Sequence, residues 1–261
     1  MNTINQQQLI LLDFVEAMDK SESLDQLFGY LESAVNQLGF DGISYTYIPL
    51  ILTTSLTRHA PLFMTSSGYD QQFIDRYAEE NLSEDDFTIH RISDQQLAPM
   101  NWWQEVAEGK LTRREKRVLN IMRYDHGLNN GLSIPVMSTD SAMAGFSIMS
   151  ADGSDSFNVL YQERLRVLQT ICRLFHDRVH AEPDFKSHFY FPVFNHFSQT
   201  EKLVVKLLAS GSQVKIIAQQ LELSERYVYN VRDKLRVKFG VTTSEKMFYL
   251  AGLLQWNELI D

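Results

Sequence analysis

Cationic, amide and phenolic side chains recur along one segment near the end of the chain, and such side chains contact DNA. From Glu225 to about Phe239 they are interspersed with apolar residues, in a pattern that gives an α-helix two faces. Such a helix could lay its polar face in the major groove while its apolar face packs on a protein core. A solvated helix that is rich in arginine is the alternative interpretation. The polar residues are Arg226, Tyr229, Asn230, Arg232, Lys234, Arg236 and Lys238, and the apolar ones are Val228, Val231 and Leu235.

The residues before this segment predict two shorter helices, separated by tight turns, that would position it. Apolar residues recur after Glu201 at the spacing of a core-facing helix, and Gly211 stands where that helix would end in a left-handed conformation. Ser212 could cap a second helix that turns Ile216 inward, and Ser224 could cap the third. Capped short helices of this kind are typical of a helix-turn-helix, and they favour the DNA-binding interpretation.

Over about residues 196–255 the chain resembles the DNA-binding domain of the LuxR family. The opening Leu-Thr-Pro-Arg-Glu of that family is similar to Phe197–Glu201, and its Glu-Ile-Ala is similar to Ile216–Ala218. Its Ser-x-x-Thr-Val-x-x-His is similar to Ser224–Val231, and its Lys-Leu-Gly-Val to Lys238–Val241. The resemblance implies a small four-helix domain, a homodimer and a two-fold symmetric site on double-stranded DNA.

The chain departs from the family pattern at three positions near the DNA-facing elements. Ile216 replaces a Glu, Tyr227 replaces a Thr and Val231 replaces a His. These changes leave the predicted fold intact, but the family's usual target sequence does not follow for this chain. We expect Arg226, Tyr229, Asn230 and Arg232 to read or flank bases, and Lys202, Lys215, Lys234 and Lys238 to hold phosphates.

A second set of residues resembles the family's autoinducer-binding domain over about residues 10–180. The family's Tyr-Pro-x-x-Trp-x-x-x-Tyr is similar to Tyr69–Tyr77, and its Asp-Pro to Asp86-Phe87. Its Pro-Phe-x-Trp is similar to Pro99–Trp102, its Gly-Leu-x-x-Gly to Gly127–Gly131, and a later small hydroxyl to Ser147. In the family these positions line a pocket for an acyl-homoserine lactone. In the family the Asp accepts a hydrogen bond from the ligand amide, and the first Trp donates one to the carbonyl of the lactone ring. A Tyr and a Ser or Thr bind the other carbonyl of the ligand.

Two departures in this set change what the pocket could bind. Phe73 stands where the family has the Trp donor, and Phe87 stands where it has Pro. Without the indole N–H, a buried lactone carbonyl would be unpaired, which costs ~1–3 kcal/mol, or about 5- to 150-fold in affinity. This favours a different small ligand that carries an N–H or O–H donor, although a core of aromatic residues with no ligand is the alternative. The expected ligand-binding residues are Tyr45, Tyr69, Phe73, Tyr77, Asp86, Phe87, Trp102 and Ser147.

Hydrophobic periodicity predicts an α+β fold for the first part of the chain. Helices at about 5–19 and 24–38, and strands at 42–49, 131–137 and 143–150, favour an α/β/α sandwich with an antiparallel sheet. A long helix at 160–179 could pack on this sheet or form a dimer seam. We expect a ligand-binding and dimerisation domain at 1–180, a polar linker at 181–195 between Pro183 and Pro192, and the helix-turn-helix domain at 196–261.

The charge is unevenly distributed between these parts. The chain has 24 Lys and Arg against 33 Asp and Glu, a net charge of −9. From His196 onward there are 9 basic and 7 acidic residues, which leaves 15 basic and 26 acidic residues before it. A weakly basic DNA-binding domain joined to an acidic module predicts that DNA affinity depends on dimerisation.

Several classes of function are not indicated by the sequence. The longest apolar runs are too short for a membrane span, and the single cysteine, Cys172, fits a core position in a reducing cytoplasm. We expect no catalytic residues, no metal ligands and no cofactor apart from a signal molecule. The sequence thus predicts a ligand-responsive transcriptional regulator of the LuxR type. A ligand-independent orphan regulator, or an adaptor that sequesters another regulator in mixed dimers, is the alternative.

Overall fold

A computed structural model describes residues 3–49, 62–139, 142–194, 197–253 and 256. Residues 3–48, 62–139 and 143–181 form one compact unit, whereas 182–194 and 197–253 belong to a second unit. None of the described helices is long and apolar enough to cross a membrane.

The first unit is built around a five-stranded sheet in the order β2-β1-β5-β4-β3. The strands are β1 (Gly42–Pro49), β2 (Leu62–Thr65), β3 (Met100–Asn101), β4 (Asn130–Ser138) and β5 (Ala142–Ser150). The pairs β1–β2, β3–β4 and β4–β5 are antiparallel, and the β4–β5 register shifts between Pro135 and Met137. The three strands predicted from the sequence are confirmed, whereas the short strands β2 and β3 were not anticipated.

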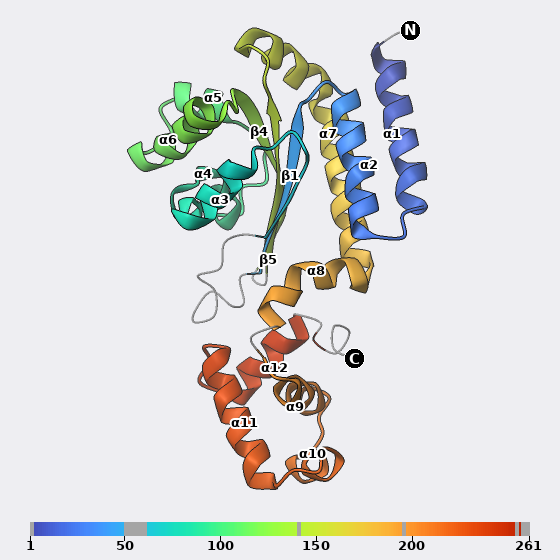
Figure 1. The fold of residues 1–261 in the computed structure, drawn as a ribbon, viewed down its shortest axis with the longest axis vertical. Helices are drawn as coiled ribbons and strands as arrows, with labels where there is room; N and C mark the ends of the chain where they lie inside the picture. The colour runs from blue at the N-terminus through green and yellow to red at the C-terminus, as the bar shows by residue number, and fades with distance from the viewer. Residues whose placement is uncertain (1–2, 50–61, 140–141, 195–196, 254–255, 257–261) are drawn as a thin grey trace. The chain divides into compact units, whose positions relative to one another are not determined.

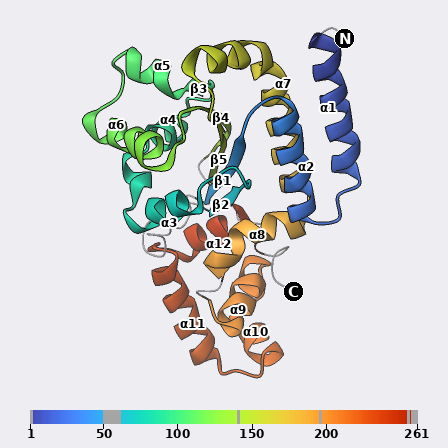
Figure 2. The same ribbon diagram turned by 45° about the horizontal axis from the view of Figure 1, so that its top comes forward.

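Helices cover both faces of this sheet, which confirms the predicted α/β/α sandwich (Figure 1). Figure 2 shows the sheet from a second angle, again between the two helical layers. One layer consists of α1 (Thr3–Asp19), α2 (Leu24–Gln37) and α7 (Ser154–Ala181). The other layer contains α3 (Gln71–Glu79), α4 (Phe87–Ser93), α5 (Trp102–Ala107) and α6 (Arg113–Asn120), with a 3-10 turn at Leu82–Asp85 and a π-helical turn at Ile121–Asp125.

The apolar side of α7 packs within its own unit. Phe175 is fully buried and meets Phe28 of α2 and Phe146 of β5 edge to face, with ring centroids 6.0 and 5.7 Å apart. Cys172 is also buried, and burial raises the pKa of its thiol, as expected for a core residue. This face of α7 therefore holds the sandwich together, as in the first of the two interpretations left open by the sequence.

The second unit is helical throughout its described elements. They are α8 (Pro183–Phe194), α9 (Gln199–Ala209), α10 (Val214–Gln220), α11 (Glu225–Lys238) and α12 (Ser244–Leu253). Most of the segment expected to link the two domains is thus the helix α8. In the rest of the unit the rings of Phe197, Phe239 and Trp256 pack together, with centroids 5.1–5.5 Å apart. This cluster ties the start of the helix-turn-helix to its end.

The helix caps agree with the sequence at two of three positions. Ser224 accepts a hydrogen bond from the Tyr227 amide at the start of α11, and Gly211 has a φ of +86° after α9. Ser212, however, does not cap α10. Its amide donates to the Leu207 carbonyl and so completes the end of α9, and α10 begins only at Val214. This later start leaves Ile216 half-exposed rather than inward.

Candidate functional site

A cavity lies between the sheet and the layer that contains α3 and α4. Its envelope is about 650 Å³, a figure that includes its opening to solvent. Because side chains alternate along a strand, β1 sends Ser44 and Thr46 to this side and Tyr45 to the other. The residues that line the cavity are Ser44, Thr46, Ile48, Phe63, Tyr69, Phe73, Ile74, Tyr77, Asp86, Thr88, Ile89, Ile92, Met122, Ser133, Met143, Ala144, Gly145, Phe146 and Ser147.

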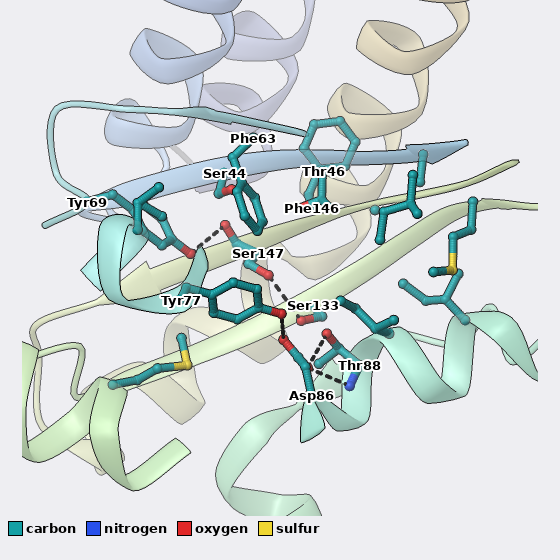
Figure 3. A pocket seen from close by; sticks show the side chains of 18 of the residues that line it. Ser44, Thr46, Phe63, Tyr69, Tyr77, Asp86, Thr88, Ser133, Phe146 and Ser147 are labelled. Carbon is teal, nitrogen blue, oxygen red and sulfur yellow. Dashed lines mark hydrogen bonds between the residues drawn. The ribbon is translucent and has the colours of Figure 1, made fainter. Parts of the chain in front are cut away.

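Asp86 is the acidic centre of this largely apolar cavity (Figure 3). Its Oδ2 accepts a hydrogen bond from the Tyr77 hydroxyl at 2.8 Å. Its Oδ1 accepts from the backbone amide and from the hydroxyl of Thr88, both at 2.8 Å. The carboxylate therefore caps α4 and joins it to α3, and Oδ2 retains a lone pair for a further donor.

A second polar group lies across the cavity on β4 and β5. The Tyr69 hydroxyl donates to the Ser147 carbonyl at 3.0 Å, and the Ser147 and Ser133 hydroxyl oxygens are 3.4 Å apart. The Trp102 indole donates to the same Ser133 hydroxyl at 2.9 Å. Figure 3 shows the Ser133 and Ser147 side chains on the strands, and Asp86 beside the start of α4.

The two phenols of the cavity remain protonated. Burial, and then the negative charge of Asp86, raises the pKa of both Tyr69 and Tyr77 well above the ordinary value. Both hydroxyls therefore act as hydrogen-bond donors and acceptors, and they do not add charge to the cavity.

Phe73 forms part of the apolar wall on α3. Its ring is buried and meets the Tyr77 ring edge to face, with centroids 5.7 Å apart. On its other side the ring lies 5.4 Å from the imidazole of His126, whose Nδ1 is 2.7 Å from an oxygen of Asp70. The position that carries an indole donor in the family is thus an apolar surface of this pocket.

Phe87 and Trp102 lie in a smaller cavity next to the first, with an envelope of about 260 Å³. The two cavities share Asp86, Thr88, Met122 and Ser147 among their walls. A Cβ atom at Gly131 would lie 2.3–2.6 Å from the Trp102 ring, so only glycine lets this ring rest against β4. Most of the expected ligand-binding residues are therefore gathered around one carboxylate.

Tyr45 lies on the other face of the sheet, in the layer that contains α7. Its hydroxyl is 2.9 Å from Nδ1 of His176, and its ring packs on Phe146 and Phe175. Burial, followed by the charges of His180 and Arg173, lowers the pKa of His176 to about 3. The structure therefore corrects the expectation for Tyr45, because strand alternation directs its side chain away from the cavity. We do not include it in the ligand site.

Four polar residues of the cavity were not anticipated. Thr88 comes two residues after Asp86 and donates to its carboxylate, whereas Ser133 comes from a strand whose orientation the sequence did not reveal. Ser44 and Thr46 alternate with aromatic residues along β1, and this alternation could have indicated that they lie on the opposite face of the strand, which lines the cavity.

The polar face expected on the third helix is present on α11. Val228, Val231 and Leu235 are buried beneath it. Arg226, Tyr229, Asn230 and Lys234 are exposed. The Arg232 guanidinium lies 4.9 Å above the Tyr229 ring and 3.5 Å from Asp233, so it is held at the flank of the helix.

The expected phosphate-binding lysines lie in different environments. Lys215 is exposed in the first turn of α10, and Lys202 is half-buried on α9. Lys238 donates to Glu201 at 2.7 Å and lies 5.3 Å from the centre of the Phe197 ring. Burial alone would raise the pKa of Glu201, but the hydrogen bonds from Lys238 and Ser198 outweigh it and hold this pKa below the usual range. Lys238 thus joins the end of α11 to the start of α9, a structural contact that the sequence analysis did not foresee.

Within the described parts of the chain, no group of three or more His, Cys, Asp or Glu side chains could hold a metal ion.

Comparisons with known proteins match the two units separately. Residues 23–179 match the model of the autoinducer binding domain, and residues 195–250 match that of the bacterial regulatory proteins of the luxR family. No curated protein matches the chain by sequence.

The fold is similar to solved structures of low sequence identity. SdiA in complex with octanoyl-rac-glycerol is 17% identical over 97% of both chains, with a TM-score of 0.51. A second structure, of Escherichia coli SdiA, is 17% identical over 97% of this chain and 98% of that one, with a TM-score of 0.49. The factor CepR2 from Burkholderia cenocepacia is 15% identical over 69% of this chain and 98% of its own, also with a TM-score of 0.49. The model of the autoinducer binding domain matches more than half of the chain, and the luxR model matches the segment that follows it. The chain therefore belongs to the LuxR family of transcriptional regulators, which are not enzymes, and it combines an autoinducer-binding domain with a DNA-binding helix-turn-helix.

Proposed function

We propose that this protein binds a two-fold symmetric DNA site as a homodimer, and that a small molecule in the cavity of the first unit controls this binding. The proposal divides the chain into a ligand-binding and dimerisation domain at 1–180, a linker at 181–195 and a DNA-binding domain at 196–261. The protein would act in the cytoplasm, where its DNA lies. The observation that carries the proposal is an apolar cavity with one carboxylate, Asp86, that can accept a further hydrogen bond.

The cavity favours a ligand with a donor group at one end and an apolar part at the other. Asp86 would accept from an N–H or O–H group of the ligand, and Ser133 and Ser147 offer hydroxyls across the cavity. The wall at Phe73 offers no N–H group to a lactone carbonyl, so a ligand other than an acyl-homoserine lactone is favoured. An acylated polyol, such as the octanoylglycerol in the SdiA complex, has the required combination of hydroxyl donors and apolar chain.

The weak positive charge of the DNA-binding domain supports the proposed homodimer. With 9 basic and 7 acidic residues from His196 onward, one copy would attract the phosphate backbone only weakly. Two copies that place their α11 helices in successive major grooves, about 34 Å apart, would add their contacts.

Two measurements on the purified full-length protein test the proposal. Mass spectrometry of an organic extract should reveal a bound small molecule, and a gel shift should show DNA binding that weakens with salt and changes when this molecule is removed and restored. Salt-dependent binding that is indifferent to small molecules would instead indicate an orphan regulator. A protein that forms mixed dimers with another regulator, and that does not bind DNA, would be an adaptor.

A further inference from the structure

Three of the five cations on α11 are paired with carboxylates of the protein. Asp233 accepts from Arg236 at 2.9 Å and lies 3.5 Å from Arg232. At the end of the helix, Lys238 is held by Glu201. We therefore expect the neutral side chains of this helix to contribute more to the recognition of a partner than its paired cations do.

Three neutral residues are spaced along this face. Tyr227, Asn230 and Val237 lie on the side of α11 away from the buried Val228 and Leu235, and they border a shallow open groove on the helix. Val237 is 73% exposed and Tyr227 is 46% exposed, so both side chains are accessible to a partner. A partner that fits this face would offer apolar groups as well as hydrogen-bonding groups.

The chemistry of the major groove meets this requirement at A·T pairs. An Asn amide donates to N7 and accepts from N6 of adenine, and thymine alone presents a methyl group in the groove. Tyr227 and Asn230 are about 4.5 Å apart along the helix axis, and Asn230 and Val237 about 10.5 Å, because each residue rises ~1.5 Å. A helix that lies along the major groove can therefore bring these three side chains to different base pairs of one half-site.

We infer that α11 reads an A·T-rich half-site, in which Asn230 recognises an adenine and Tyr227 and Val237 contact thymine methyl groups. This inference rests on the proposed DNA binding and names the base pairs that such binding selects. Arg226 and Lys234 remain exposed on the same helix and can hold the flanking phosphates.

The test begins with selection of binding sites from a random double-stranded DNA pool by the full-length protein. The enriched half-site is then made with single thymines replaced by deoxyuridine, which lacks the methyl group, and with single adenines replaced by 7-deazaadenine. We expect fluorescence anisotropy to show about fourfold weaker binding for each methyl contact removed, the factor that burial of one methyl group contributes. At one adenine, the loss of N7 should weaken binding to a similar or larger extent.

Variants connect these effects to the named residues. Val237→Ala should abolish the sensitivity to deoxyuridine at one position only, and Asn230→Ala should abolish the sensitivity to 7-deazaadenine. Val159→Ala changes a comparably exposed valine on α7 and should leave all sensitivities intact. Salt-dependent binding to selected sites that ignore both base analogues would overturn the inference and leave the proposed DNA binding in place. If no DNA is bound at any salt concentration, both proposals are wrong.

Discussion

Replacement of Asp86 by Asn tests the ligand site with little disturbance of the fold. Asn is as good a helix cap as Asp, and its remaining oxygen can still accept from the amide and hydroxyl of Thr88. The new amide group would face the hydroxyl of Tyr77, which can rotate to accept instead of donating. We therefore expect the free energy of unfolding to change by about 1 kcal/mol or less.

The effect of this substitution on the ligand should be much larger. A ligand donor that met a carboxylate oxygen would now meet either a weaker acceptor or a second donor. Hydrogen bonds to charged groups contribute about 1.5–3 kcal/mol, so the apparent affinity should fall roughly 10- to 150-fold.

The assay is a dose–response curve of DNA binding against the molecule extracted from the purified protein, with chemical denaturation as the stability control. Asp85→Asn is the matched variant, because it makes the same change one residue earlier, where the carboxylate lies 4.0 Å from Arg114 outside the cavity. If Asp86→Asn and Asp85→Asn gave the same dose–response curve as the parent, Asp86 would not be the ligand anchor.

Three further predictions follow from other contacts. Phe73→Trp should strengthen the response to acyl-homoserine lactones by ~1–3 kcal/mol, because it adds an indole donor, and it should weaken the response to the native ligand. Titration of the variant and the parent with both kinds of ligand measures these changes. A parent protein that already responds strongly to lactones would contradict the prediction. Lys238→Ala should destabilise the helix-turn-helix by roughly 1–3 kcal/mol in denaturant, since it leaves Glu201 without its cation, whereas Lys234→Ala should mainly lower the salt slope of DNA binding. The pKa of His176 is lowered to about 3 in the folded protein, so below pH ~6.5 this imidazole is protonated in the unfolded chain but not in the folded one. This residue should therefore reduce the free energy of unfolding by up to about 1.4 kcal/mol for each pH unit between pH 6.5 and pH 3. His176→Asn should flatten that part of the stability curve, and an unchanged slope would count against the burial of a neutral imidazole.

The sequence predicted β1 well but not the role of each of its faces. Its bounds, Gly42–Pro49, and its alternation agree with the structure. Periodicity, however, separates the two faces of a strand without saying what covers each of them. Here α7 covers the face with Tyr45, and the cavity lies against the face with Ser44 and Thr46. In this strand the face with the aromatic residues belongs to the core, and the face with the small hydroxyl residues belongs to the cavity.

The helix-turn-helix shows a related limit. Local signals were sufficient for the cap at Ser224 and the turn at Gly211, because each acts within a few residues of its own position. The pairing of Lys238 with Glu201 joins residues 37 positions apart, and no local pattern distinguishes such a lysine from one that faces solvent. The charge of a side chain on a predicted helix therefore indicates a DNA contact only when its neighbours in space are known.

The structure also changes the reason for expecting a ligand. From the sequence, a carboxylate among aromatic residues required a donor, and a ligand was one way to provide it. In the structure Tyr77 and Thr88 already donate three hydrogen bonds to Asp86, so this partly buried carboxylate has partners without any ligand. These hydrogen bonds do not explain the open, largely apolar space that lies beside the carboxylate. A ligand is therefore expected because of the open space next to Asp86 rather than because of its charge, and extraction of the purified protein tests whether a molecule occupies that space.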